Sequence, residues 1–237
     1  MNKEFAVVIS PHIDDAAISI GEILRGYDKV LVLNVFNKSI ETVTGVSKKD
    51  VNNHRILEDK KIAQQYGFEF KYANLPDTSL RGIDWNNHNL PIDQELLTQV
   101  QEWIKSELDQ VEADFRIFIP ASYGLHPDHC LATLTFSTGP LLYYLKWIPF
   151  FVYCDQPYFL NRKIIKDKHE GHSALEESGT LIAVPFSVVE KRIMLSAYKS
   201  QLSPERVKLL AGKNKAEYYW ITSHKFFKFF TKNLGGK

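Results

Sequence analysis

Continuous apolar runs alternate along this chain with segments whose apolar residues recur at helical spacing. Runs such as K-V-L-V-L-N-V-F and F-R-I-F-I-P are typical of strands buried on both faces of a sheet. The pattern predicts strands near 4–9, 29–36, 68–74, 115–120 and 149–154. It predicts helices near 15–25, 51–66 and 94–109, a helix from Pro127, one after Ser187 to about residue 200, and one from Pro204. This alternation indicates a single-domain α/β fold with a Rossmann-like, mostly parallel sheet flanked by helices on both faces.

Polar residues mark the predicted helix ends. Asp50 and Asp93 stand where N-caps belong, Ser187 and Glu190 have capping-box spacing, and Gly67 is a favoured stop. The connections 37–50 and 75–92 are long for such a fold, which is typical of loops that carry function. The polar segment 161–180 is a candidate flap.

Composition narrows the class of protein. The 29 basic and 28 acidic side chains leave a formal charge of +1, which gives no support to nucleic acid or an anionic membrane as the main partner. Cys130 and Cys154 are too few for a disulfide framework and are expected as reduced thiols. The N-terminus lacks the pattern of a signal peptide, and the longest apolar stretch, 141–153, is too short to span a bilayer. We therefore expect a soluble, cytoplasmic protein. A homo-oligomer stays open as an alternative.

Two clusters of ionisable residues follow predicted strands. The segment P-H-I-D-D at 11–15 follows the first strand, and H-P-D-H at 126–129 follows the fourth. Sites in parallel sheets form at the carboxyl ends of strands, so the clusters face each other if these two strands are neighbours. Three mixed imidazole and carboxylate ligands with one position open to water are the pattern of catalytic zinc. The two adjacent aspartates suit a division between metal binding and water activation.

At these residues the sequence resembles the PIG-L/LmbE-like family of zinc-dependent N-acetylglucosaminyl deacetylases. The first motif of that family reads roughly (A/S)-H-P-D-D-E and the second H-P-D-H. The resemblance implies that His12, Asp15 and His129 bind Zn²⁺, another divalent metal such as Fe²⁺ being an alternative. It also implies that Asp14 is the general base, that His126 stabilises the oxyanion or donates a proton, and that Asp128 orients His126.

Weaker matches continue between and after the two motifs. Arg55 resembles the family's substrate-facing arginine, Asp77 a carboxylate near the sugar, and Tyr198 a tyrosine that reaches the site in some members. The resemblance covers about residues 4–201, so that 202–237 is expected to be a C-terminal extension packed on one domain of residues 1–237.

The first motif departs from the family pattern at two positions. Ile13 replaces the usual proline and Ala16 the usual acidic residue. Neither is an assigned ligand, so the expected chemistry is unchanged. Loss of the acidic residue suggests a divergent branch, which bears on the substrate more than on the reaction.

The resulting expectation is a zinc hydrolase that removes an N-acetyl group from an N-acetylglucosamine-type sugar or sugar conjugate. It would use metal-activated water, Asp14 as base and a protonated His126. The alternatives are an amidase acting on another small N-acyl metabolite and a non-catalytic sugar-binding protein of the same fold. No G-x-G-x-x-G follows the first strand, which argues against a dinucleotide-dependent enzyme.

Each site residue also has an ordinary structural alternative. Asp14 could cap the first helix, Arg55 could pair on the helix surface, Asp77 could form a turn, and Tyr198 could belong to the core. Tyr123 is a candidate second polar group near His126.

Two further segments have compositions that could indicate binding to a metal or a membrane. The segment H-E-G-H at 169–172 suggests a second metal site, although an exposed loop is the simpler interpretation. The aromatic and basic run K-F-F-K-F-F-T-K at 225–232 could lie on a membrane surface, or it could close the core as an edge strand or helix.

Overall fold

The computed structural model describes residues 4–41, 47–85, 91–160, 175, 177, 179–213, 215–223 and 226–227. Within them the strands form one sheet in the order β3-β2-β1-β4-β5-β7-β6. The first five are parallel: β1 (Phe5–Ser10), β2 (Lys29–Asn34), β3 (Phe68–Tyr72), β4 (Phe115–Pro120) and β5 (Phe150–Tyr153). All five agree with the sequence prediction.

Two strands were not predicted from the sequence. β6 (Thr180–Pro185) and β7 (Ala216–Ile221) pair antiparallel with each other, and β7 pairs antiparallel with β5. The sheet is therefore mostly parallel with an antiparallel edge. Thr180, expected at the end of a flap, begins β6. The rest of that segment, and the H-E-G-H motif, lie outside the described residues apart from isolated positions.

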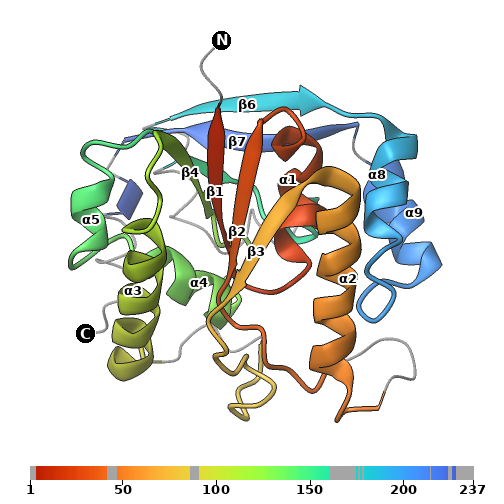
Figure 1. Ribbon diagram of the computed structural model, residues 1–237, viewed down its shortest axis with the longest axis horizontal. Helices are drawn as coiled ribbons and strands as arrows, with labels where there is room; N and C mark the ends of the chain where they lie inside the picture. Colours follow the sequence, from red (N-terminus) through yellow and green to blue (C-terminus); the bar gives the residue numbers. More distant parts are fainter. Residues whose placement is uncertain are drawn as a thin grey trace.

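Helices cover both faces of the sheet (Figure 1). One layer contains α3 (Gln94–Leu108), α4 (Pro127–Leu134) and the short α5 (Leu141–Tyr144). The other contains α1 (Asp15–Leu24), α2 (Val51–Tyr66), α8 (Val188–Leu195) and α9 (Pro204–Lys213). None of the described helices is both long and apolar enough to cross a bilayer.

The apolar run of β1 explains this two-sided architecture. Phe5, Val7 and Ile9 pack in the core beneath α3, α4 and α5. Ala6 and Val8 pack in the opposite core with α1, α2, α8 and α9. Because neighbouring side chains of a strand point to opposite faces, only a continuous apolar run can fill both cores.

The helix ends agree only partly with the predictions. The Asp93 side chain caps α3 by accepting a hydrogen bond from the Leu96 N–H at 3.0 Å, and Ser187 caps α8. Asp50 occupies the N-cap position of α2, but its side chain makes no capping hydrogen bond. The helix after Ser187 ends at Leu195 rather than near residue 200, because the chain then turns toward α2.

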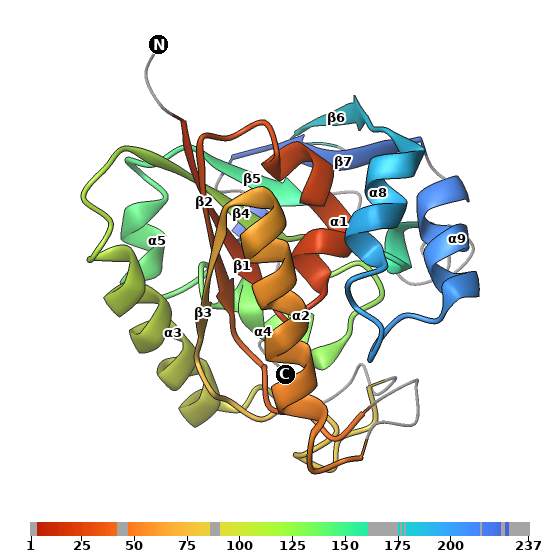
Figure 2. The same ribbon diagram turned by 45° about the vertical axis from the view of Figure 1, so that its right-hand side comes forward.

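Helix α1 is broken near its middle, where Ile20 has φ −139° and ψ 16°. A buried ion pair occupies the break. Glu217 of β7 accepts a hydrogen bond from the Ile23 N–H at 2.8 Å, and the Lys191 ammonium donates to the Ala17 carbonyl at 2.6 Å and pairs with Glu217. These side chains satisfy backbone groups that an intact helix would pair internally. Figure 2 shows α8 lying beside α1, with α9 next to it.

The C-terminal aromatic run contributes to the core. Phe226 and Phe227 are buried, and the Phe227 ring lies 5.4 Å from that of Phe150. At these two positions the core-closing interpretation is correct. The rest of the run lies outside the described residues.

Candidate active site

The two predicted clusters meet at the carboxyl ends of the parallel strands. Strand β1 lies between β2 and β4, with Val8 opposite Val32 on one side and Phe118 on the other. The connections that follow β1 and β4 therefore leave the sheet next to each other. The expectation that the first and fourth strands are neighbours is confirmed.

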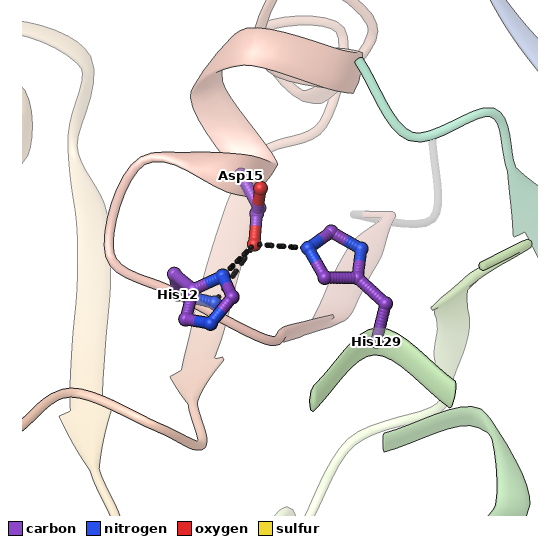
Figure 3. A group of neighbouring side chains, drawn as sticks. All are labelled: His12, Asp15 and His129. Carbon is purple, nitrogen blue, oxygen red and sulfur yellow. Dashed lines mark hydrogen bonds and ion pairs between the residues drawn. The ribbon is translucent and has the colours of Figure 1, made fainter. Parts of the chain in front are cut away.

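Three side chains, those of His12, Asp15 and His129, converge at this end of the strands (Figure 3). His12 comes from the turn that follows β1, Asp15 is the first residue of α1, and His129 comes from α4. The Asp15 Oδ2 atom lies 3.1 Å from His12 Nδ1 and 3.2 Å from His129 Nε2. One donor atom of each residue lies within 4.8 Å of the other two. Two imidazole nitrogens and one carboxylate oxygen at this spacing fit a divalent cation such as zinc.

The electrostatics of His12, Asp15 and His129, called the trio below, also favour a cation. Burial would lower the pKa of His129, but the carboxylates of Asp15 and Asp155 together outweigh it and raise the pKa to about 9. Burial likewise opposes the charge on His12, yet hydrogen bonds to Asp128 and Asp15 hold its pKa well above the ordinary value. Burial would raise the pKa of Asp15, but His129 and His12 keep it far below its usual range. In the metal-free protein, imidazole protons supply the positive charge that Asp15 attracts.

Asp155 supports His129 from behind. Its Oδ2 lies 2.7 Å from His129 Nδ1, and its Oδ1 accepts a hydrogen bond from the Ala121 N–H at 2.9 Å. A carboxylate on the second ring nitrogen fixes the tautomer and orientation of a ligating histidine. The sequence interpretation missed Asp155, although its place directly after a predicted strand was a usable signal.

Asp14 stands beside the trio and is half-buried. It occupies the N-cap position of α1, but its side chain makes no capping hydrogen bond, so the capping alternative is wrong. Burial and the neighbouring Asp15 raise the pKa of Asp14 to about 6, with Arg55 and His12 opposing this shift. A carboxyl group with this pKa can accept a proton near neutral pH.

His126 faces the same space from the start of α4. Its ring centroid lies 5.0 Å from that of His12 and 5.2 Å from that of His129. Its Nδ1 accepts the Asp128 N–H at 3.2 Å, which caps the helix and leaves the proton of the neutral ring on Nε2. Burial, and then the two other imidazoles, lower its pKa well below the ordinary value. The ring is therefore a neutral donor in the metal-free protein, not the protonated group that the sequence suggested.

The carboxylate of Asp128 contacts other partners than expected. Its Oδ2 lies 2.9 Å from His12 Nε2 and accepts the Thr78 N–H at 3.0 Å, while its Oδ1 pairs with Arg81. Only its backbone N–H reaches His126, because the ring caps the helix with the nitrogen that a carboxylate would otherwise orient. Asp128 thus orients His12 and anchors the loop that carries Arg81.

The predicted substrate residues have different surroundings. Arg55 is buried and donates to the Glu41 carbonyl at 2.7 Å. Its Nε has no hydrogen-bond partner among the described residues, and its positive charge opposes the rise in the pKa of Asp14. It faces the site rather than the helix surface. The Asp77 carboxylate accepts from the Ser79 hydroxyl and the Leu80 N–H, as the turn-forming alternative predicts.

Tyr198 packs in the core beneath the site. It is 1% exposed, and its hydroxyl donates to Asp59 Oδ1 at 3.0 Å. Glu58 accepts hydrogen bonds from the N–H and hydroxyl of Ser200, both at 2.7 Å. These contacts fasten the chain after α8 to α2. Tyr123 is also buried, and its hydroxyl accepts the Trp220 Nε1–H at 2.8 Å, which directs it away from the trio.

Comparison with known proteins gives the family. The sequence profile of PIG-L, described as GlcNAc-PI de-N-acetylase, matches residues 7–137, more than half of the 237 residues. No curated protein matches the chain in sequence.

Solved structures share the fold at low identity. A deacetylase–teicoplanin complex from the biosynthesis pathway of teicoplanin superposes with a TM-score of 0.67 and 19% identity, over 92% of this chain and 98% of that one. The zinc-inhibited form of teicoplanin deacetylase Orf2 gives 0.66 and 18%, over 91% and 97%. N,N'-diacetylchitobiose deacetylase from Pyrococcus horikoshii gives 0.58 and 16%, over 96% and 86%. With its fold, its paired motifs and this profile match, the chain belongs to the PIG-L family of metal-dependent N-deacetylases.

Proposed function

We propose that the protein is a zinc-dependent hydrolase that removes the N-acetyl group from an N-acetylglucosamine-type sugar or sugar conjugate. The observation that carries the proposal is the convergence of His12, Asp15 and His129 on one point, with Asp14 free of any capping role beside them. His12, Asp15 and His129 would hold Zn²⁺, or another divalent metal such as Fe²⁺. A bound cation would polarise the acyl carbonyl and acidify water.

The protein's own groups perform the proton transfers. Asp14, ionised at neutral pH because its pKa is about 6, takes a proton from the attacking water. A carbon–oxygen bond forms at the acyl carbon, and the Nε2–H of His126 donates a hydrogen bond to the developing oxyanion. The carbon–nitrogen bond then breaks, and Asp14 passes the proton that it took from the water to the leaving amine, while neutral His126 keeps its own proton. The products are acetate and a free amino sugar.

The remaining predicted residues would form the substrate side of the site. Arg55 has a buried Nε that no residue of the described ranges engages, and it is the best placed of them for a sugar hydroxyl. Asp77 would act through the turn that it holds, and Tyr198 through Asp59, which its hydroxyl contacts. A cytoplasmic location is proposed on the two unpaired cysteines, both buried.

An acetate-release screen tests the function. The zinc-loaded protein would be incubated with N-acetylglucosamine, N,N'-diacetylchitobiose and N-acetylated amino acids, with Asp14→Asn as the matched control. Release from the sugars supports the proposal, whereas release only from the amino acids favours the alternative amidase. Sugar binding without release in the wild-type protein favours a non-catalytic sugar-binding protein.

A further inference from the structure

Tyr158 lies against the two histidines of α4. It begins the short 3-10 turn Tyr158–Leu160, three residues after Asp155. Its ring centroid lies 5.5 Å from that of His129, edge-on at 84°, and 6.5 Å from that of His126. The ring therefore forms a wall of the site on the side of these imidazoles.

Gly124 makes room for this ring. With φ at +88°, Gly124 has a backbone conformation that side chains rarely adopt. A Cβ at that position would lie 2.7 Å from the Tyr158 Cγ and overlap the ring edge. The segment between β4 and His126 thus omits a side chain where the Tyr158 ring is seated. This seat holds the ring in one place beside the catalytic groups.

The Tyr158 hydroxyl remains available. Within the described part of the chain it has no hydrogen-bond partner. The ring that carries this hydroxyl lies against His129 and His126, the two imidazoles of the site. A phenolic hydroxyl is an ordinary hydrogen-bond donor at neutral pH. By contrast, the hydroxyl of Tyr123, the tyrosine closest in sequence to His126, is engaged by Trp220.

We infer that Tyr158 is a further catalytic residue, whose hydroxyl donates a hydrogen bond to the acyl oxygen of the substrate as the carbonyl carbon becomes tetrahedral. This inference rests on the proposed function. Tyr158 would act together with the Nε2–H of His126, so that two neutral donors share the oxyanion. No proton leaves Tyr158 in this step.

Replacing the hydroxyl alone tests the inference. Tyr158→Phe keeps the ring in its seat against Gly124, so zinc content and KM should stay at wild-type values. The turnover number should fall on the order of 10²-fold, the usual effect of losing one oxyanion donor. Tyr143→Phe, an exposed position on α5, is the matched control and should behave as wild type. The substrate must be one on which His126→Ala has a reduced kcat. If Tyr158→Phe kept the wild-type kcat on that substrate, the inference would be overturned.

A binding experiment separates this inference from the proposed function. Methylphosphonate, a tetrahedral anion with the shape of a hydrated acetyl group, would be titrated calorimetrically into the zinc-loaded protein. We expect about tenfold weaker binding to Tyr158→Phe than to wild type, since one hydrogen bond to a charged oxygen contributes about 1.5 kcal/mol or more. Equal affinities would overturn the role of Tyr158 even where acetate release confirms the deacetylase. A difference in affinity supports it even where no tested sugar is a substrate.

The packing of the Tyr158 ring against Gly124 can be tested by a double-mutant cycle. Gly124→Ala should lower kcat in the wild-type background, because its Cβ displaces the ring. The same change should have a smaller effect in a Tyr158→Ala background, where the ring is gone. Additive effects would show that Gly124 and Tyr158 act independently.

Discussion

The Oδ2 atom of Asp155 lies 2.7 Å from Nδ1 of His129, which leaves the opposite ring nitrogen, Nε2, directed at Asp15. The first prediction follows from this pair. Asp155→Asn should weaken zinc binding about 10–100-fold, because the uncharged amide orients the ring less firmly and makes it less basic. Competition with a fluorescent chelator measures the affinity. Asp109→Asn, at the exposed end of α3, is the control. Equal affinities of Asp155→Asn and wild type would show that the contact has no effect on the metal site.

The two adjacent aspartates should fail in different ways. Asp14→Asn keeps the shape of the side chain but removes the proton acceptor, so zinc should stay bound while turnover falls about 10²–10⁴-fold. Asp15→Asn removes the negative charge between His12 and His129, so zinc should bind more weakly and excess zinc should partly restore activity. Zinc content and acetate release, measured with and without added metal, separate the two. The opposite pattern would reverse the roles, and no change in either variant would refute the deacetylase proposal.

Zinc affinity should rise with pH. In the metal-free protein the pKa of His129 is about 9, so its ring carries a proton at neutral pH. Because zinc binds the neutral ring, each binding event releases at least one proton, and the affinity should increase by about tenfold or more per pH unit between roughly pH 6 and 8. Titrations in two buffers of different ionisation enthalpy count the protons. His126→Ala should keep the same slope, because the pKa of His126 already lies well below its ordinary value. A pH-independent affinity would contradict the assignment of His129 as a ligand.

The ion pair at the break in α1 should matter for stability. Lys191 is 1% and Glu217 2% exposed, so Lys191→Met leaves a buried carboxylate without its counter-charge. The free energy of unfolding should fall by about 3–5 kcal/mol. Urea denaturation measures it, and Lys105→Met, which removes an exposed partner of Asp109, should change it by less than about 1 kcal/mol. A Lys191→Met variant as stable as wild type would mean that Glu217 finds other compensation.

The five parallel strands could be predicted, whereas β7 and β6 at the antiparallel end of the sheet were missed. Residues 29–34 and 115–120 are nearly continuous apolar runs, which few other structures produce. β7 carries a glutamate in its interior, Glu217, whose buried partner Lys191 comes from a distant helix. A sequence pattern cannot show that two charges neutralise each other across the fold.

The candidate site divides in the same way. His12, Asp14 and the H-P-D-H segment could be found because they form short motifs at strand ends. Asp155 had one usable signal, its place after a predicted strand, but its partner His129 depends on β5 lying next to β4. The place of Tyr158 depends on the space above Gly124. Those relationships exist only in three dimensions. The expected partner of Asp128 was wrong because a helix cap, a local backbone feature, uses the nitrogen of His126 that the motif seemed to leave free.

The sheet order also determines when during folding the metal site can exist. His12 and His129 are separated by more than a hundred residues of chain, and they approach each other only when β1 pairs with β4. Parallel pairing across such a loop is slow, because the entropy of closing the loop is lost before the contacts form. Zinc added to the unfolded chain would therefore find no assembled site and would not nucleate the fold. Its binding would instead report that the central strands have closed, which makes the metal a marker of completed folding.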